Sequence, residues 1–254
     1  MKIKRIVRIA LIVLAAFLGL AILLGALNAL FGGGEWTFGW TAYRYDDTGF
    51  EIGSGTVYVD GLQSVDIDWI DGRVTVVVCD DFLPSVTETS TLDLTEDSRM
   101  RRCVDVKEKA LTVKYRKPSS FLGGDQNKQK DLIVRIPKRM LEGLKTLRIN
   151  AASSEIHVDG VFADSLEIVS KSGNVSVALH PQMESISIQS KQGDVVLLSA
   201  EAPSLSLFYV TKRGGSPTLD FFFEQRDGRL VSGEGTTVAN VATERGGLTV
   251  KSAK

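Results

Sequence analysis

Cysteine and histidine are scarce in this chain, and neither sign of charge is in excess. Its 254 residues contain two Cys and two His, and 30 Lys and Arg stand against 31 Asp and Glu, a formal net charge of −1. Two Cys and two His cannot make a convincing zinc site. A net charge near zero gives no global field that attracts nucleic acid. We therefore expect no metal, no cofactor and no nucleic-acid partner.

Catalytic motifs are also missing from the sequence. It has no phosphate-binding loop, no dinucleotide-binding fingerprint and no glycine-rich calcium repeat. His157 alternates with apolar neighbours and should face solvent, and His180 precedes a proline in a predicted loop. Asp66, Asp68 and Asp71 resemble the acidic clusters that polysaccharide-cleaving β-helices use with calcium, but their positions on a strand and its corner predict a solvated face. We expect no catalytic residues and a protein that is not an enzyme.

What the chain does contain is a short repeat. Two apolar-x-apolar pairs start nine residues apart, and a Gly usually stands between them. Ser154 replaces this Gly in the second copy, so that corner is expected to differ in backbone conformation. The copies begin at Val65, Leu147, Leu166, Ile186, Phe221 and Ala239, with a weak copy at Leu205.

This repeat predicts stacked β-structure. Alternation with period two places one set of side chains on each face of a strand, and the intervening Gly, Ser and Asn residues favour a tight turn. One repeat cannot bury its apolar face alone, whereas stacked repeats build a continuous core. We expect an all-β, mostly parallel β-solenoid with rungs (single turns of the coil) of about 20 residues. Antiparallel hairpins in a sandwich are the alternative.

Two parts of the chain depart from the repeat. Residues 77–146 carry strand-like runs without the period, and we expect longer, less regular rungs there with a polar loop at 118–130. The corner of the 205 copy is longer and should form a bulging loop. The last pair, Leu248 to Val250, is expected to be the end of the stack, and an uncovered end would be a docking edge.

The first residues predict the cellular location. Residues 9–31 contain no charged side chain, and 23 residues of helix span about 35 Å, enough to cross a membrane. A basic tail, 1–8, precedes this segment and acidic residues follow it, which predicts a single-pass protein of the cell membrane with a cytoplasmic N-terminus. A cleaved signal peptide is the alternative. We expect a Gly-rich and aromatic linker at 32–56 and an extracytoplasmic solenoid at 57–254.

Two candidate sites remain. Cys79 and Cys103 could form a disulfide outside the cytoplasm, or they could be thiols on strands that never meet. In successive repeat copies Lys171, Lys191 and Arg226 occupy one corner position, with Arg213 near it, so they could line one edge of the stack. This edge is either a solvated corner that resists aggregation or a basic strip that binds an anionic envelope polymer or phospholipid headgroups.

The segments 165–177, 185–197 and 65–76 resemble a bacterial family of unknown function that is often labelled "putative adhesin". The resemblance covers residues 57–250. It implies a membrane-anchored β-solenoid and offers no catalytic residues. We therefore expect a non-enzymatic cell-envelope protein that presents its solenoid for binding or scaffolding. The alternative is an accessory of envelope-stress signalling that acts through a membrane protein partner.

Overall fold

The computed structural model describes residues 47–91, 93–117 and 129–253, all within one compact unit, Tyr43–Lys254. These residues form eighteen strands and two short 3-10 helices, η1 (Glu96–Ser98) and η2 (Lys138–Gly143), so the all-β prediction is confirmed. No helix among them is long and apolar enough to cross a membrane. The predicted tail, membrane segment and most of the linker (1–46), and most of the predicted polar loop, lie outside the described residues.

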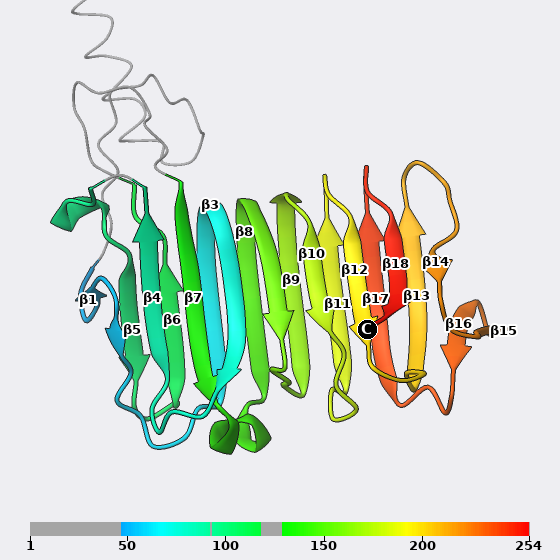
Figure 1. The fold of residues 1–254 in the computed structure, drawn as a ribbon, viewed down its shortest axis with the longest axis horizontal. Coiled ribbons are helices and arrows are strands. Elements are labelled where there is room, and N and C mark those ends of the chain that lie inside the picture. Colours follow the sequence, from blue (N-terminus) through cyan, green and yellow to red (C-terminus); the bar gives the residue numbers. More distant parts are fainter. Residues whose placement is uncertain (1–46, 92, 118–128, 254) are drawn as a thin grey trace, which may run out of the picture. The chain divides into compact units, whose positions relative to one another are not determined.

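The centre of the molecule is a stack of parallel rungs (Figure 1). Each rung has a first and a second strand joined at a corner, and in the two longest strands the corner lies within the strand itself. The central strands are β3 (Ser64–Cys79), β8 (Thr146–Asp159), β9 (Ser165–Ser172), β10 (Val175–Ala178), β11 (Ser185–Ser190), β12 (Val195–Ser199), β13 (Leu205–Thr211), β14 (Thr218–Leu219), β17 (Thr237–Thr243) and β18 (Leu248–Ser252).

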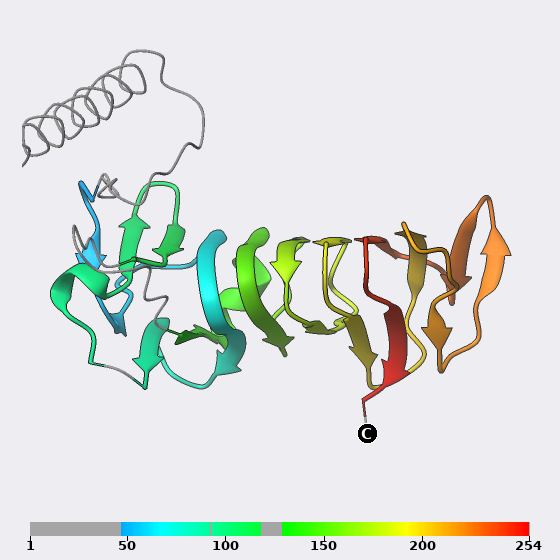
Figure 2. The same cartoon turned by 90° about the horizontal axis from the view of Figure 1, so that it is seen from above.

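The rungs do not stack in the order of the sequence. β17 pairs with β11 on one side and with β13 on the other, and β18 lies likewise between β12 and β14. The last rung is therefore inserted between its two predecessors, and Figures 1 and 2 show its red strands between the yellow and orange ones. The prediction that Leu248 to Val250 ends the stack was wrong, because both edges of that rung are paired.

Both ends of the stack are antiparallel, so the strand pairing is mixed and the predicted parallel pairing holds in the centre of the stack. At the N-terminal end β4 pairs antiparallel with β7, and β5 with β6, while β6 and β7 join β3 in parallel. At the C-terminal end the 221 copy forms a hairpin instead of a rung. The end strands are β1 (Glu51–Ile52), β2 (Gly55–Thr56), β4 (Ser85–Ser90), β5 (Arg101–Asp105), β6 (Ala110–Lys114), β7 (Lys130–Pro137), β15 (Glu224–Arg226) and β16 (Arg229–Ser232).

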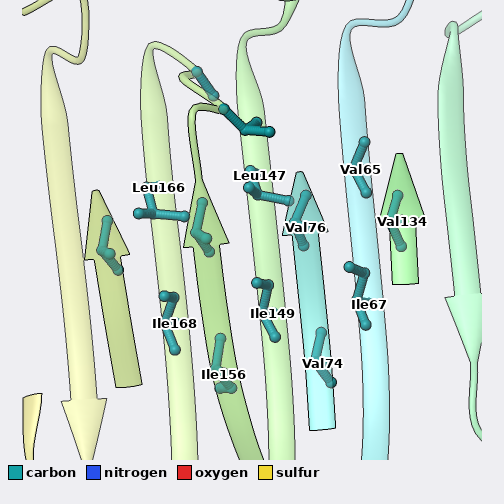
Figure 3. Packing of buried hydrophobic residues seen from close by; sticks show 14 of the residues in the cluster. Val65, Ile67, Val74, Val76, Val134, Leu147, Ile149, Ile156, Leu166 and Ile168 are labelled. Atoms are coloured by element: carbon teal, nitrogen blue, oxygen red, sulfur yellow. The ribbon is translucent and has the colours of Figure 1, made fainter. Parts of the chain in front are cut away.

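The core consists of columns of equivalent apolar residues from successive rungs. One column contains Ile67, Ile149, Ile168 and Ile188, each at most 1% exposed (Figure 3 shows the first three). Burying one such side chain contributes roughly 1.5–3 kcal/mol. Outside the 221 copy, the apolar-x-apolar pairs of the sequence therefore supply inward residues of the rung strands, as predicted.

Glycine allows the corners of neighbouring rungs to approach closely. Gly72, Gly173 and Gly193 have φ angles of +102°, +105° and +131°, which L side chains rarely adopt. A Cβ atom at Gly193 would lie 2.6 Å from the carbonyl carbon of Gly173 in the rung below. Ser154, in register with Gly72, does not share the positive φ, which confirms that its corner differs in conformation.

Candidate functional site

The predicted basic edge exists in part. Ser170 near the end of β9 pairs with Ser190 at the end of β11, so Lys171 and Lys191 follow at the same corner position. The backbone N–H of Lys191 donates to the carbonyl of Ser170 over 2.9 Å. The two lysines are therefore neighbours on adjacent rungs, as the repeat predicted, and both are exposed.

The inserted rung supplies the next basic side chain, Arg245. Its N–H donates to the carbonyl of Lys191 over 3.1 Å, and Glu244 before it occupies the corner position itself. On the following rung, the N–H of Lys212 donates to the carbonyl of Thr243 over 3.2 Å. Four consecutive corners thus carry the five exposed residues that we call the basic ridge: Lys171, Lys191, Arg245, Lys212 and Arg213.

One carboxylate stands within the basic ridge. Glu244 forms an ion pair with Lys212 at 2.7 Å. The hydrogen bond from Lys212 lowers the pKa of the Glu244 carboxyl below its ordinary value, and the positive charges of Lys191 and Arg245 contribute to the same shift. Glu244 therefore stays ionised at neutral pH and offsets one of the five positive charges.

A second acidic side chain on these corners, Asp194, accepts a hydrogen bond from the backbone of a neighbouring rung. Asn174 accepts the N–H of Asp194 over 3.0 Å, and Asp194 accepts the N–H of Gly247 over 2.8 Å. Each side chain thus binds the next rung of the stack. Within the described part of the chain, the basic-ridge residues other than Lys212 form no ion pair, so their charges face solvent.

Two of the predicted edge residues behave differently. Arg213 follows Lys212 at the outer end of the ridge, in the longer corner that the sequence predicted. Arg226 does not belong to the ridge, because it lies in the β15–β16 hairpin and pairs with Glu224. Its inclusion was wrong. Arg245 was not predicted. It stands one residue beyond the corner position of the 239 copy, and that copy was predicted to lie at the far end of the stack.

The predicted acidic cluster lies on a polar outer face of the stack. Arg148 forms ion pairs with Glu167 at 2.9 Å and with Asp66 at 3.4 Å. The side chain of Asn150 donates to Asp68, and Asp71 accepts the N–H of Gly72. Among the described residues, no group of three or more His, Cys, Asp or Glu could hold a metal ion. These contacts fit the solvated face that the alternation predicted.

The two cysteines are free thiols in this structure. Cys103 on β5 lies opposite Thr112 of β6, and Thr112 in turn lies opposite Asp66 in the first half of β3. Cys79 ends the second half of β3, beyond the Gly72 corner, opposite Pro137. The disulfide that the sequence allowed is therefore not formed, because the two strands place the thiols on different faces of the stack. Burial raises the pKa of the Cys79 thiol.

A buried ion pair in the N-terminal end was not predicted. Lys130 Nζ lies 2.7 Å from Glu88 Oε1, and the two side chains are 1% and 2% exposed. The ammonium also donates to the carbonyl of Ser98 over 2.7 Å and lies 3.9 Å from the ring centroid of Tyr115. The Glu88 carboxylate also accepts the N–H of Met100. Every one of these contacts lies inside the protein, so we assign this pair to stability.

The comparisons with known proteins agree with this architecture. A family model described as Toastrack DUF4097 matches residues 64–250. The chain is similar to the crystal structure of a "putative cell adhesion protein" from Clostridium sporogenes, with 10% identity and a TM-score of 0.63, over 80% of this chain and 100% of that one. A "putative adhesin" from Bacteroides fragilis matches with 10% identity over 80% of this chain and 97% of that one, and its TM-score of 0.26 supports no argument. No curated protein matches the chain. At these identities the first likeness shows the fold alone.

Proposed function

The chain belongs to the Toastrack DUF4097 family, and we propose that it is a non-enzymatic binding module of the cell envelope that holds an anionic polymer along its basic ridge. The observation that carries this proposal is the run of Lys171, Lys191, Arg245 and Lys212 over four consecutive rungs, with Glu244 as the carboxylate among them. The predicted membrane segment at 9–31 would hold the domain at the outer surface of the cell membrane.

The spacing of the ridge suits a polymer with regularly repeated negative charges. Adjacent rungs of a sheet are about 4.8 Å apart, and two unit charges 4 Å apart in water repel by about 1 kcal/mol. A polyanion that lies along the corners would replace this repulsion with attraction. Because the ridge is exposed, the attraction is screened by salt. Phosphate-bearing envelope polymers carry the required charge.

Reversing three charges of the ridge should abolish most of this binding. We expect Lys171→Glu, Lys191→Glu and Arg245→Glu together to weaken binding of the full-length protein to immobilised poly(glycerol phosphate) by about 100-fold or more, since each cation near an anionic surface contributes about 1 kcal/mol. Raising the salt concentration should weaken binding of the unmodified protein as well. Biolayer interferometry at several salt concentrations measures both effects.

A matched control separates the ridge from net charge. Lys107, Lys145 and Lys251 are exposed and lie away from the ridge corners, and their replacement by Glu changes the net charge equally. We expect this variant to keep its affinity within about threefold. If the two variants lost affinity equally, net charge alone would explain the loss, and the proposal that the ridge binds the polymer would be contradicted.

The signalling alternative makes a different prediction. If the unmodified protein fails to bind the polymer, but crosslinking in its native membrane captures one membrane protein, the polymer-binding proposal is wrong. Loss of that capture when residues 1–31 are replaced by another anchor would then support an accessory role in envelope-stress signalling.

A further inference from the structure

The C-terminal end of the stack leaves part of one strand unpaired. β13 pairs with β17 along its whole length, 205–211, but with β16 only from Leu205 to Leu207. Within the described part of the chain, no strand lies beside the outer edge of residues 208–211. The C=O of Thr211 accepts the N–H of Gly214 over 3.4 Å, and the other outward backbone groups of this edge are free to pair with another strand.

This open edge is apolar on its solvent side. Phe208 is 44% exposed and Val210 is 48% exposed, whereas Tyr209 between them turns inward and hydrogen-bonds Thr243. The core column that contains Ile67 and Ile188 continues through Val241 and ends at Tyr209. The side chain of Tyr209 is only half-buried. Natural edges are usually protected by charge, proline or a bulge. None of these interrupts residues 208–211.

Opposite charges flank the open edge. Arg213 follows it in the corner, and Asp227 stands at the tip of the β15–β16 hairpin with a φ angle of +48°. Both side chains are exposed, and neither forms an ion pair within the described part of the chain. The hairpin leaves β13 after the Leu207–Leu230 pair, so its tip borders the beginning of the open edge.

We propose that this edge binds the same edge of a second copy of the chain, with the two β13 strands antiparallel about a two-fold axis at Val210. Val210 then faces the partner's Val210, and Phe208 lies beside the aliphatic stem of the partner's Lys212. In this register, residues that lie opposite each other on the two strands point to the same face of the joined sheet, so their apolar side chains pack together. Arg213 lies where the partner's Asp227 can pair with it.

The symmetry favours a second copy over a longer assembly. A two-fold contact uses the same edge twice and leaves no further edge open, whereas a head-to-tail contact needs a complementary edge at the other end. At that other end β1 pairs antiparallel with Arg101 and Arg102 of β5, and Arg102 binds Glu51, so charged side chains stand at this edge. The open apolar edge therefore matches itself better than it matches the opposite end of the stack.

A disulfide trap tests this contact. Directly opposed residues of antiparallel strands have Cα atoms about 4.5–5.5 Å apart, within the range of a disulfide. In the full-length protein with Cys79→Ser and Cys103→Ser, we expect Val210→Cys to form a reducible dimer in the native membrane. Val169→Cys is the matched control, because Val169 is similarly exposed, at 43%, but its strand is paired on both sides.

The flanking charges provide a second test of the same arrangement. We expect Arg213→Glu to slow formation of the Val210→Cys dimer at least fivefold, and Asp227→Arg in addition to restore it. A dimer yield at Val210→Cys no higher than at Val169→Cys would overturn the proposal. So would a reducible adduct whose mass is not twice that of the chain. Failure of the charge swap to restore the rate would overturn the two-fold register.

Discussion

Replacing Gly193 by Ala should destabilise the protein by about 3–5 kcal/mol. Two costs add: the φ of +131° is strained for any L side chain, and a Cβ atom would lie 2.6 Å from the carbonyl carbon of Gly173 and 3.2 Å from the N atom of Asn174. The backbone of the rung below cannot move away without breaking its own pairing. Urea unfolding of the full-length protein, followed by circular dichroism, measures the change.

Gly214→Ala is the matched control for this substitution. Gly214 lies in the corner of the 205 rung and also has a positive φ, +68°, but a Cβ atom there would meet no heavy atom within 4 Å. We expect it to lose only about 1–2 kcal/mol, from backbone strain alone. If the two variants lose equal stability, close stacking of the corners is not what requires glycine at position 193.

Replacing Lys130 by Met should cost about 3–5 kcal/mol of the free energy of unfolding. The change keeps most of the side-chain volume but leaves the Glu88 carboxylate buried without its ion-pair partner, and an uncompensated buried charge is strongly destabilising. The carbonyl of Ser98 also loses its ammonium donor. Chemical denaturation at neutral pH is the measurement.

Lys138→Met tests whether burial is the cause. Lys138 forms an ion pair of nearly the same length, 2.8 Å, with Asp80, but the two side chains are 69% and 87% exposed. Exposed pairs contribute little, so we expect a much smaller loss of stability than for Lys130→Met. Adding Glu88→Leu to Lys130→Met should recover part of the lost stability, because it removes the orphaned charge. Equal effects of the two lysine substitutions would contradict this explanation.

The sequence predicted the local structure of each rung well. The apolar pairs around Ile168 and Val175 are inward-facing strand residues, and Gly173 is the corner between them, as the alternation required. The adjacency of Lys171 and Lys191 followed from the same spacing. These features are local, because period-two alternation and turn chemistry depend on neighbours in the chain.

The order of the rungs could not be obtained in this way. A rung with Ala239 and Val241 fits any parallel neighbour with the same alternation, so nothing local indicates that it inserts before the 205 rung. Arg245 was missed for that reason. Arg226 was included because Gly228 imitates a rung corner, although Asp227 and Gly228 with their positive φ angles form a hairpin tip.

The buried ion pair illustrates a second limit. Lys130 ends a polar, Gly-rich stretch, and such composition predicts a solvated loop. It is buried because it begins β7, where Glu88 on β4 and the ring of Tyr115 surround its ammonium group. These partners are 42 and 15 residues away in the chain, so only the tertiary structure shows that a charge is compensated there.

The central claim is that the inserted rung builds one basic ridge, and single charge reversals test it most directly. Arg245→Glu and Arg226→Glu change the net charge equally, but Arg245 stands next to Lys191 whereas Arg226 lies in the hairpin. Affinity for poly(glycerol phosphate) should fall at least fivefold for Arg245→Glu and should stay within twofold for Arg226→Glu. A larger loss for Arg226→Glu, or equal losses, would contradict the ridge that this stack creates.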